Sequence, residues 1–273
     1  MDSPRFIFFG TPALAVTVLE ELEKAHLLPL AIVTTPDKPA GRGLEVTPSP
    51  VKVWATTHSS ALFQPSKLDE NFGAELAKLA PELFVVAAYG KIIPEHILSI
   101  PKKGVLNVHP SLLPRYRGPS PIESQILADE KEMGVSVILL DEQVDHGPIL
   151  GQKSFSIPEP LDRVQVNDLL WHAGGELLAS ILPAWIDGTL SSMPQDDNRA
   201  TFTKKIQKED GEIDLTGDPR QNYLKYLAYQ GWPGVYFFKN GKRIKVTKAT
   251  YENGKFVILR VVPEGKPEME YQS

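Results

Sequence analysis

Hydrophobic and polar positions along the first 190 residues follow a pattern that predicts strands separated by helices. Several of the apolar runs are continuous rather than alternating, which is typical of parallel strands covered on both faces. The runs are RFIFFG (5–10), PLAIVTT (29–35), LFVVAAYG (83–90), GVLNVHP (104–110) and GVSVILLD (134–141). Amphipathic stretches lie between or after them, at 12–25, 69–80, 121–130 and 161–187. The pattern predicts an α/β fold with a doubly wound, mostly parallel, Rossmann-like sheet.

The pattern changes twice beyond residue 187. Positions 188–204 lose all periodicity and gather Ser, Asp and Asn, which is typical of a linker. An amphipathic stretch at 218–229 is followed by alternating positions that are interrupted by two Asn-Gly pairs, at 240–241 and 253–254. Asn-Gly between alternating strands favours a tight hairpin. We therefore expect a first domain at 1–187, a linker at 188–204 and a small antiparallel β domain at 205–273.

The composition excludes several kinds of chemistry. Without a cysteine among 273 residues, the chain has no disulfide, no thiolate metal site and no cysteine nucleophile, and it fits a reducing compartment. The first residues do not combine a basic segment with a longer apolar one, so we expect no signal peptide. No apolar run approaches the roughly 18 residues that a bilayer requires, so we expect no membrane association.

The net charge of −5 is unevenly distributed. Residues 1–203 hold 16 Lys and Arg against 25 Asp and Glu, a balance of −9, whereas residues 204–273 hold 13 against 9, a balance of +4. An acidic body with a basic C-terminal segment can hold a polyanion through that segment. Nucleic acid therefore stays among the possible partners.

The turn after the first predicted strand lacks the glycines of a nucleotide-binding loop. The stretch FFGTPALA contains Gly10 but not the pattern G-x-G-x-x-G, and the chain has no G-x-x-x-x-G-K-[ST]. Thr11 and Pro12 instead predict a helix N-cap followed by proline at the first helical position. We therefore expect neither a nicotinamide cofactor nor ATP.

Polar side chains follow two of the predicted strands. Asn107 and His109 lie two residues apart, so they share one face at the end of the strand at 104–110, and Asp145 lies in the loop after the strand at 134–141. Taken singly, such residues are more often turn caps, core histidines or solvated acids. Ligands of open α/β sheets, however, bind outside the carboxyl ends of the strands, where we expect these three to meet. An imidazole held by a carboxylate can take a proton and an amide can hold an oxyanion, which suits acyl transfer to an amine.

Several longer blocks resemble the formyltransferases that use 10-formyltetrahydrofolate. NVHPSLLPRYRGPSPI (107–122) is followed at a distance by DHG (145–147), and further similar blocks occur throughout the chain. The resemblance is to those members that formylate the α-amino group of methionyl initiator tRNA, a step of translation initiation. The further blocks are FFGTPALA (9–16), TTPDKPAGRGLEVTPSPVKVWA (34–55), TFTKKIQKEDGEIDL (201–215) and GWPGVYFF (231–238).

The resemblance implies roles for individual residues. Asn107, His109 and Asp145 would be the catalytic residues, with His109 taking the proton, Asn107 holding the oxyanion and Asp145 supporting His109. The folate co-substrate would lie against the proline-rich turn and against the backbone of a second turn. These folate-binding residues are Ser111, Leu112, Leu113 and Pro114, with Ala87, Ala88, Tyr89 and Gly90. No metal or nicotinamide would be required.

The resemblance also implies how tRNA is held. The loop at 36–49, with Lys38 and Arg42, would enter the acceptor end, although Leu44 and Glu45 stand where basic residues are common in the family. The second domain would be an OB-like fold, but RIKVTKAT is followed almost directly by KFVILRVVPEGKPEMEYQS, so we expect a shortened barrel. The location implied is the cytoplasm, of bacterial type, or an organellar matrix.

Other readings stay open at this point. Sugar-nucleotide N-formyltransferases use the same donor and share the three residues and the WPG block. Glycinamide ribonucleotide formyltransferase fits less well because it normally lacks a second domain. A protein of another class, a folate- or RNA-binding module without catalysis, would not need the three residues to be intact.

Overall fold

In the computed structural model, which describes residues 4–40 and 45–272, the chain divides by its contacts into two compact units. The first comprises Met1–Arg117, Gly134–Ser154 and Asp168–Ala200. The second comprises Gly118–Met133, Phe155–Asn167 and Thr201–Ser273. The domain limits expected from the sequence, 1–187, 188–204 and 205–273, stay a prediction.

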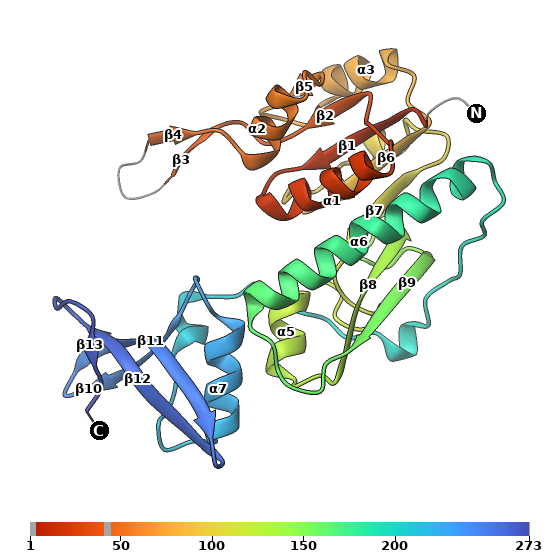
Figure 1. Cartoon of the computed structure of the whole chain (residues 1–273). Coiled ribbons are helices and arrows are strands. Elements are labelled where there is room, and N and C mark those ends of the chain that lie inside the picture. The colour runs from red at the N-terminus through yellow and green to blue at the C-terminus, as the bar shows by residue number, and fades with distance from the viewer. Residues whose placement is uncertain (1–3, 41–44, 273) are drawn as a thin grey trace. The chain divides into compact units, whose positions relative to one another are not determined.

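A seven-stranded sheet organises the first unit, with the order β5-β2-β1-β6-β7-β8-β9 (Figure 1). The pairings from β5 to β7 are all parallel, which together with the flanking helices confirms the expected mostly parallel Rossmann-like fold. The strands are β1 (Phe6–Gly10), β2 (Ala31–Val33), β5 (Leu62–Phe63), β6 (Leu83–Ala87), β7 (Val105–His109), β8 (Glu132–Leu139) and β9 (Ile149–Ser156). A separate hairpin consists of β3 (Lys38–Ala40) and β4 (Glu45–Thr47).

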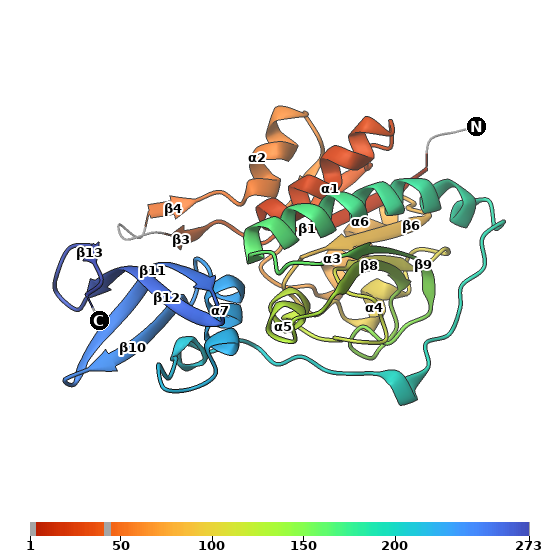
Figure 2. The ribbon, with the colours of Figure 1, turned by 60° about the horizontal axis from the view of Figure 1, so that its bottom comes forward.

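Helices cover both faces of this sheet, as the apolar runs require. On one face α3 (Glu70–Lys78) and α4 (Glu95–Leu98) contribute to a buried cluster with side chains from β1, β2 and β6. On the other face lie α1 (Ala13–Lys24) and α6 (Arg163–Ile186) (Figure 2). A side chain at Gly174 of α6 would meet Val108 and Val135, and one at Gly175 would meet Glu21 of α1, so these two glycines permit the close approach. The remaining helix of this unit is α2 (Pro50–Thr57).

Helix α6 is the one helix within the described ranges that is long and apolar enough to cross a membrane by length and composition. Core helices of globular proteins meet the same criterion. Leu170, Leu178 and Leu182 of α6 are fully buried in the structure. This helix is therefore only weak evidence for a membrane-spanning segment.

Two local expectations are wrong. Thr11 does not cap α1; Pro12 occupies the N-cap position, and the Thr11 hydroxyl donates instead to the carbonyl of Tyr89, at 3.2 Å. Strand β8 runs antiparallel to β7, with His109 opposite Ser136 and Leu106 opposite Leu139, so its carboxyl end lies at the opposite edge of the sheet from that of β7. The apolar run at 134–141 gives no sign of direction, because a strand buried on both faces has the same composition in either orientation.

The second unit combines helices with an open sheet of four antiparallel strands. The strands are β10 (Val235–Lys239), β11 (Lys242–Glu252), β12 (Lys255–Pro263) and β13 (Met269–Glu270), in that order in the sheet. Both expected hairpin turns are present, since Asn240, Gly241, Asn253 and Gly254 all have positive φ angles of 51–75°. The helices are α5 (Pro121–Leu127) and α7 (Pro219–Ala228).

An ion pair connects the two helices of the second unit. The Arg220 guanidinium, on α7, donates to both carboxylate oxygens of Asp129, just after α5, at 2.9–3.1 Å, and each side chain is 26–27% exposed. Burial acts to raise the pKa of Asp129, but the hydrogen bonds from Lys131 and Arg220 outweigh it, so this pKa lies below its ordinary value. The pair therefore stabilises the fold only while the carboxyl group is ionised.

Replacing Arg220 by alanine should lower the free energy of unfolding by about 1.5 kcal/mol at neutral pH, because a hydrogen-bonded, partly buried charge loses its partner. A carboxyl group with a depressed pKa contributes stability above its unfolded pKa of about 3.9 and loses it as the pH falls through the folded pKa. The difference between wild type and Arg220→Ala should therefore shrink below about pH 4. Thermal melts across pH measure it. Arg260→Ala, which breaks the exposed pair with Glu268, serves as the control; an equal loss there would contradict the argument.

Candidate active site

Two of the expected site residues lie at the carboxyl end of β7. Asn107 is half-buried and has no side-chain hydrogen bond to another described residue, whereas His109 is only 4% exposed. Because residues two apart on a strand point to the same side, both side chains face the same region. The amide of Asn107 is thus available to a ligand.

Asp145 lies close to His109, as expected, but a loop and not a parallel strand end places it there. The loop 140–148, which connects β8 to β9, brings its carboxylate Oδ2 to 3.6 Å from His109 Nδ1. The loop packs tightly against the end of β8, where a side chain at Gly147 would collide with the Leu139 carbonyl. Asp145 itself has a φ of 49°, in the left-handed region. The loop, rather than a shared carboxyl edge of parallel strands, brings the two residues together.

Hydrogen bonding determines the tautomer of His109. Its Nε2 lies 2.9 Å from the Tyr116 carbonyl oxygen, which can only accept a hydrogen bond, so Nε2 carries the proton. In the neutral ring Nδ1 therefore bears the lone pair. The 3.6 Å between Nδ1 and Asp145 is longer than a hydrogen bond but short enough for the carboxylate to stabilise the ring once Nδ1 is protonated.

The turn at 111–114, expected to bind folate, is held from beneath by two polar side chains of the sheet. Ser136, fully buried on β8, donates its hydroxyl to the Ser111 carbonyl at 2.6 Å and accepts from the Leu113 amide at 3.1 Å. Gln152, on β9, donates to the Leu113 carbonyl at 2.9 Å and to the Ser136 hydroxyl at 2.8 Å. The turn is therefore fixed by a network in which every buried backbone group named here has a partner.

The second expected folate-binding segment is the turn after β6. Ala88 and Gly90 have φ angles of 48° and 75°, so the backbone turns sharply there. The ring of Tyr89 does not face a ligand; it is 2% exposed and packs edge-on against Phe9 in the core. Burial raises the pKa of Tyr89 to about 12. Ala87 is also fully buried, so of this turn only Ala88 and Gly90 are exposed enough to line a site.

Of the expected tRNA-binding residues, Lys38 is exposed on β3. Glu45, which stands where the family often has a basic residue, is exposed on β4. Arg42 and Leu44 lie outside the described residues. Lys52, the third basic residue of this region, is paired with Asp37 at 2.6 Å. The hydrogen bonds from Lys52 and Gln64 hold the pKa of the Asp37 carboxyl below its ordinary value.

Sequence reasoning did not find four polar residues that support the site. They are Tyr116, Ser136, Gln152 and Gln195, and the last of them donates to the carbonyls of Asp145 and Gly147 at 2.9 and 2.8 Å. Only Ser136 leaves a signal, as a hydroxyl inside the apolar run GVSVILL. Within the described ranges, no group of three or more histidine, aspartate or glutamate side chains is arranged to hold a metal ion.

Replacing Ser136 by alanine should lower the free energy of unfolding by about 1–3 kcal/mol, since the Leu113 amide would be left buried without a partner. If the 111–114 turn binds folate, the KM for the folate should also rise. Chemical denaturation and initial rates measure the two effects. Ser180→Ala, which removes an exposed hydroxyl bonded within α6, is the matched control; an unchanged stability and KM in Ser136→Ala would contradict the role assigned to this network.

The fold and the arrangement around His109 can be compared with known proteins. Residues 4–182 match the model of the formyl transferase family, and residues 205–271 match that of the formyl transferase C-terminal domain. The chain belongs to the formyl transferase family, which confirms the resemblance seen in the sequence. It is 44% identical over 246 residues to the methionyl-tRNA formyltransferase of Chloroflexus aurantiacus, covering 90% of this chain and 79% of that one.

Two solved structures share the fold. The methionyl-tRNA formyltransferase from Clostridium thermocellum superposes with a TM-score of 0.64 at 16% identity, covering 98% of this chain and 100% of that one. HypX from Aquifex aeolicus, in complex with tetrahydrofolic acid, has a TM-score of 0.70 at 15% identity and covers 98% of this chain but 46% of that one.

Proposed function

We propose that this protein transfers the formyl group of 10-formyltetrahydrofolate to the α-amino group of methionyl initiator tRNA, in a bacterial-type cytoplasm or an organellar matrix. The 44% identity to a methionyl-tRNA formyltransferase supports the choice of acceptor. The single structural observation that carries the chemistry is His109, whose Nε2 is bonded to a carbonyl and whose Nδ1 lies 3.6 Å from Asp145. This arrangement provides a base with one defined nitrogen.

Each residue has one task in the reaction. The neutral amine attacks the formyl carbon, a C–N bond forms, and the formyl oxygen becomes an oxyanion that accepts a hydrogen bond from the Asn107 amide. His109 Nδ1 takes the proton that the amine loses, and the Asp145 carboxylate stabilises the imidazolium that results. The bond from the formyl carbon to N10 then breaks, and His109 returns its proton to N10. Atoms and protons balance without an oxidant or reductant.

The folate would lie between two turns of the first unit. The turn at 111–114 offers backbone and apolar surface held rigidly by Ser136 and Gln152. Ala88 and Gly90 offer a backbone that a flat ring can approach closely, since nothing lies within 4 Å of the position a Gly90 side chain would take. A turn that is held in place before binding loses little conformational entropy when the ligand arrives.

The sheet of the second unit would contribute contacts to the tRNA backbone. In the register of β10 and β11, Tyr236 is opposite Lys245 and Phe238 is opposite Arg243, so the four side chains share one face. Arg243 lies over the Tyr236 ring at 5.2 Å, and Phe238 is 54% exposed. Tyr236 is only 8% exposed, so Phe238 is the ring that a base could reach. Cations beside an exposed aromatic ring suit a nucleic acid, because the cations contact phosphates and the ring stacks on a base.

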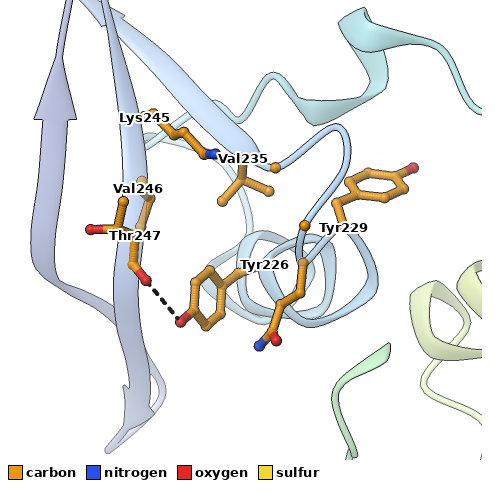
Figure 3. A pocket seen from close by; sticks show the side chains of 9 residues that line it. Tyr226, Tyr229, Val235, Lys245, Val246 and Thr247 are labelled. Carbon is orange, nitrogen blue, oxygen red and sulfur yellow. Dashed lines mark hydrogen bonds between the residues drawn. The ribbon is translucent and has the colours of Figure 1, made fainter. Parts of the chain in front are cut away.

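A small pocket shares Lys245 with this set of residues (Figure 3). It has a volume of about 240 Å³ and lies between the end of α7 and strands β10 and β11, where the Tyr226 hydroxyl donates to the Thr247 carbonyl at 3.5 Å. Lys245 is the one charged residue among those that line it. A phosphate group near this pocket would therefore meet a cation.

Formylation of a defined acceptor tests the proposal. The full chain is incubated with 10-formyltetrahydrofolate and either methionine-charged initiator tRNA or a nucleotide-linked amino sugar, and the products are separated by mass. We expect formylmethionyl-tRNA and no formylated sugar. Formylation of the sugar alone would show that the acceptor is an amino sugar and not methionyl-tRNA. The absence of any formylated product would refute the proposed reaction.

A further inference from the structure

Residues 188–204, predicted from the sequence to be a linker, contact the loop that carries Asp145. Gln195, which is half-buried in this segment, donates both hydrogens of its side-chain amide to that loop: to the Asp145 carbonyl at 2.9 Å and to the Gly147 carbonyl at 2.8 Å. The two acceptor carbonyls belong to the residues on either side of His146, and the first of them is that of Asp145 itself. A single amide group therefore holds the backbone on both sides of His146.

Arg117 fixes the orientation of the Gln195 side-chain amide by donating hydrogen bonds to its oxygen. Arg117, which is 3% exposed, donates from Nε and Nη2 to the Gln195 Oε1 at 3.0 and 2.9 Å. Because a guanidinium can only donate, the oxygen of Gln195 must face it and the nitrogen must face the loop. Arg117 also pairs with Asp197 at 2.7 Å, two residues further along.

We propose that Gln195 is a positioning residue for the formyl transfer proposed above, because it holds the Asp145 loop in the one conformation that presents the carboxylate to His109. The inference rests on that proposed function. Asp145 has a positive φ and lies in the loop between β8 and β9. A non-glycine residue in this region persists only where its surroundings determine it. The Gln195 amide supplies that constraint.

The two ion pairs of His146 do not substitute for the hydrogen bonds of the Gln195 amide. His146 bonds to Asp141 at 2.6 Å and approaches Asp197 at 3.4 Å, so its ring ties the loop to its own start and to the 188–204 segment. Asp141 and Asp197 are 36% and 63% exposed, so these pairs are screened by solvent. Neither pair contacts the carbonyls that Gln195 holds.

Steady-state kinetics of Gln195→Ala, in the full chain, test the proposal. A small displacement of a group supporting the base is expected to lower kcat by about 10–100-fold. The KM values for 10-formyltetrahydrofolate and methionyl-tRNA should stay within about twofold, because Gln195 is assigned no contact with either substrate. Gln143→Ala, which removes an exposed amide from the same loop, should keep the wild-type rate. A wild-type kcat in Gln195→Ala would overturn the proposal.

A double-mutant cycle separates positioning from a general structural effect. In an Asp145→Asn background the carboxylate is already gone, so adding Gln195→Ala should cost little further activity. A full, additive loss would show that Gln195 acts by another path and would overturn the proposal. If the alanine variant does not fold, Gln195→Glu gives the same test, since it keeps the shape and the acceptor for Arg117 but cannot donate to the loop.

Amide hydrogen exchange gives a readout that does not depend on activity. Residues 141–147 should exchange faster in Gln195→Ala than in wild type or Gln143→Ala. Unchanged exchange rates at residues 141–147 would contradict the proposal that Gln195 holds this loop. If the wild-type protein formylated no methionyl-tRNA, the proposed function would fail, while the exchange rates would still decide whether Gln195 holds the loop.

Discussion

Replacing His109 by alanine should lower kcat for formylation by about 10²–10⁴-fold, the usual contribution of a general base. The side chain is almost fully buried, and its Nε2 is hydrogen-bonded to the Tyr116 carbonyl, so Nδ1 is the ring nitrogen left to take the proton. Single-turnover rates with saturating folate and methionyl-tRNA measure the loss. His96→Ala, an exposed imidazole on α4, should leave the rate unchanged.

The two companion residues should show graded losses. Asn107→Ala removes the proposed oxyanion donor, which typically costs about 10²–10³-fold in kcat. Asp145→Ala removes the charge that stabilises the protonated ring and should also lower kcat. Near wild-type rates in all three variants, with the fold intact by circular dichroism, would show that the acyl-transfer site lies elsewhere.

Replacing Arg243 by alanine should raise the KM for methionyl-tRNA while the KM for 10-formyltetrahydrofolate stays unchanged. Each phosphate contact that is lost should also flatten the dependence of log Kd on log salt by roughly one unit, because fewer counterions are released. The Arg243 guanidinium lies over the Tyr236 ring and has no ion-pair partner among the described residues, so its charge is available to a phosphate. Binding measured between low and physiological salt checks both parts.

Lys245→Ala should behave in the same way, and the double variant should lose roughly two units of salt slope. Lys78→Ala, an exposed cation on α3 of the first unit, is the control. These substitutions are a cleaner test than deleting 205–273, because the deletion would remove α7, whose Arg220 holds Asp129 beside α5. An Arg243→Ala variant with equal losses toward tRNA and folate would show that this face supports the fold instead of the RNA.

The sequence allowed the fold to be predicted where local patterns decide it. Continuous apolar runs identified β1, β6 and β7, and the Asn-Gly pairs located both hairpin turns of the second unit. The direction of β8 could not be predicted in this way, because direction is set by the connection from α5 and not by burial. Strand β9 was also missed, because its last six residues, GQKSFS, are largely exposed and lack a buried run.

The sequence indicated which polar residues of the candidate site would lie near one another, but not how the fold brings them there. Asn107 and His109 could be found because two polar side chains interrupt an apolar strand at its end. Asp145 was expected beside them for a wrong reason, since a loop and not a parallel strand end brings it there. The supports from Gln152 and Gln195 lie 43 and 86 residues from His109 in sequence, and their single polar side chains resemble those of any exposed strand or loop.

The edge strands of the second unit's sheet determine which C-terminal fragments of the protein can stay free of aggregation. An unpaired edge strand templates the addition of another chain and so promotes aggregation. Here β13 has two residues, and part of the β10 edge is occupied by the Ile213 amide, which donates to the Tyr236 carbonyl at 2.9 Å. The open four-stranded sheet thus leaves little unpaired strand edge for another chain to join. Fragments that begin after Ile213 would expose β10 and should aggregate, so a C-terminal fragment intended for study has to begin upstream of that residue.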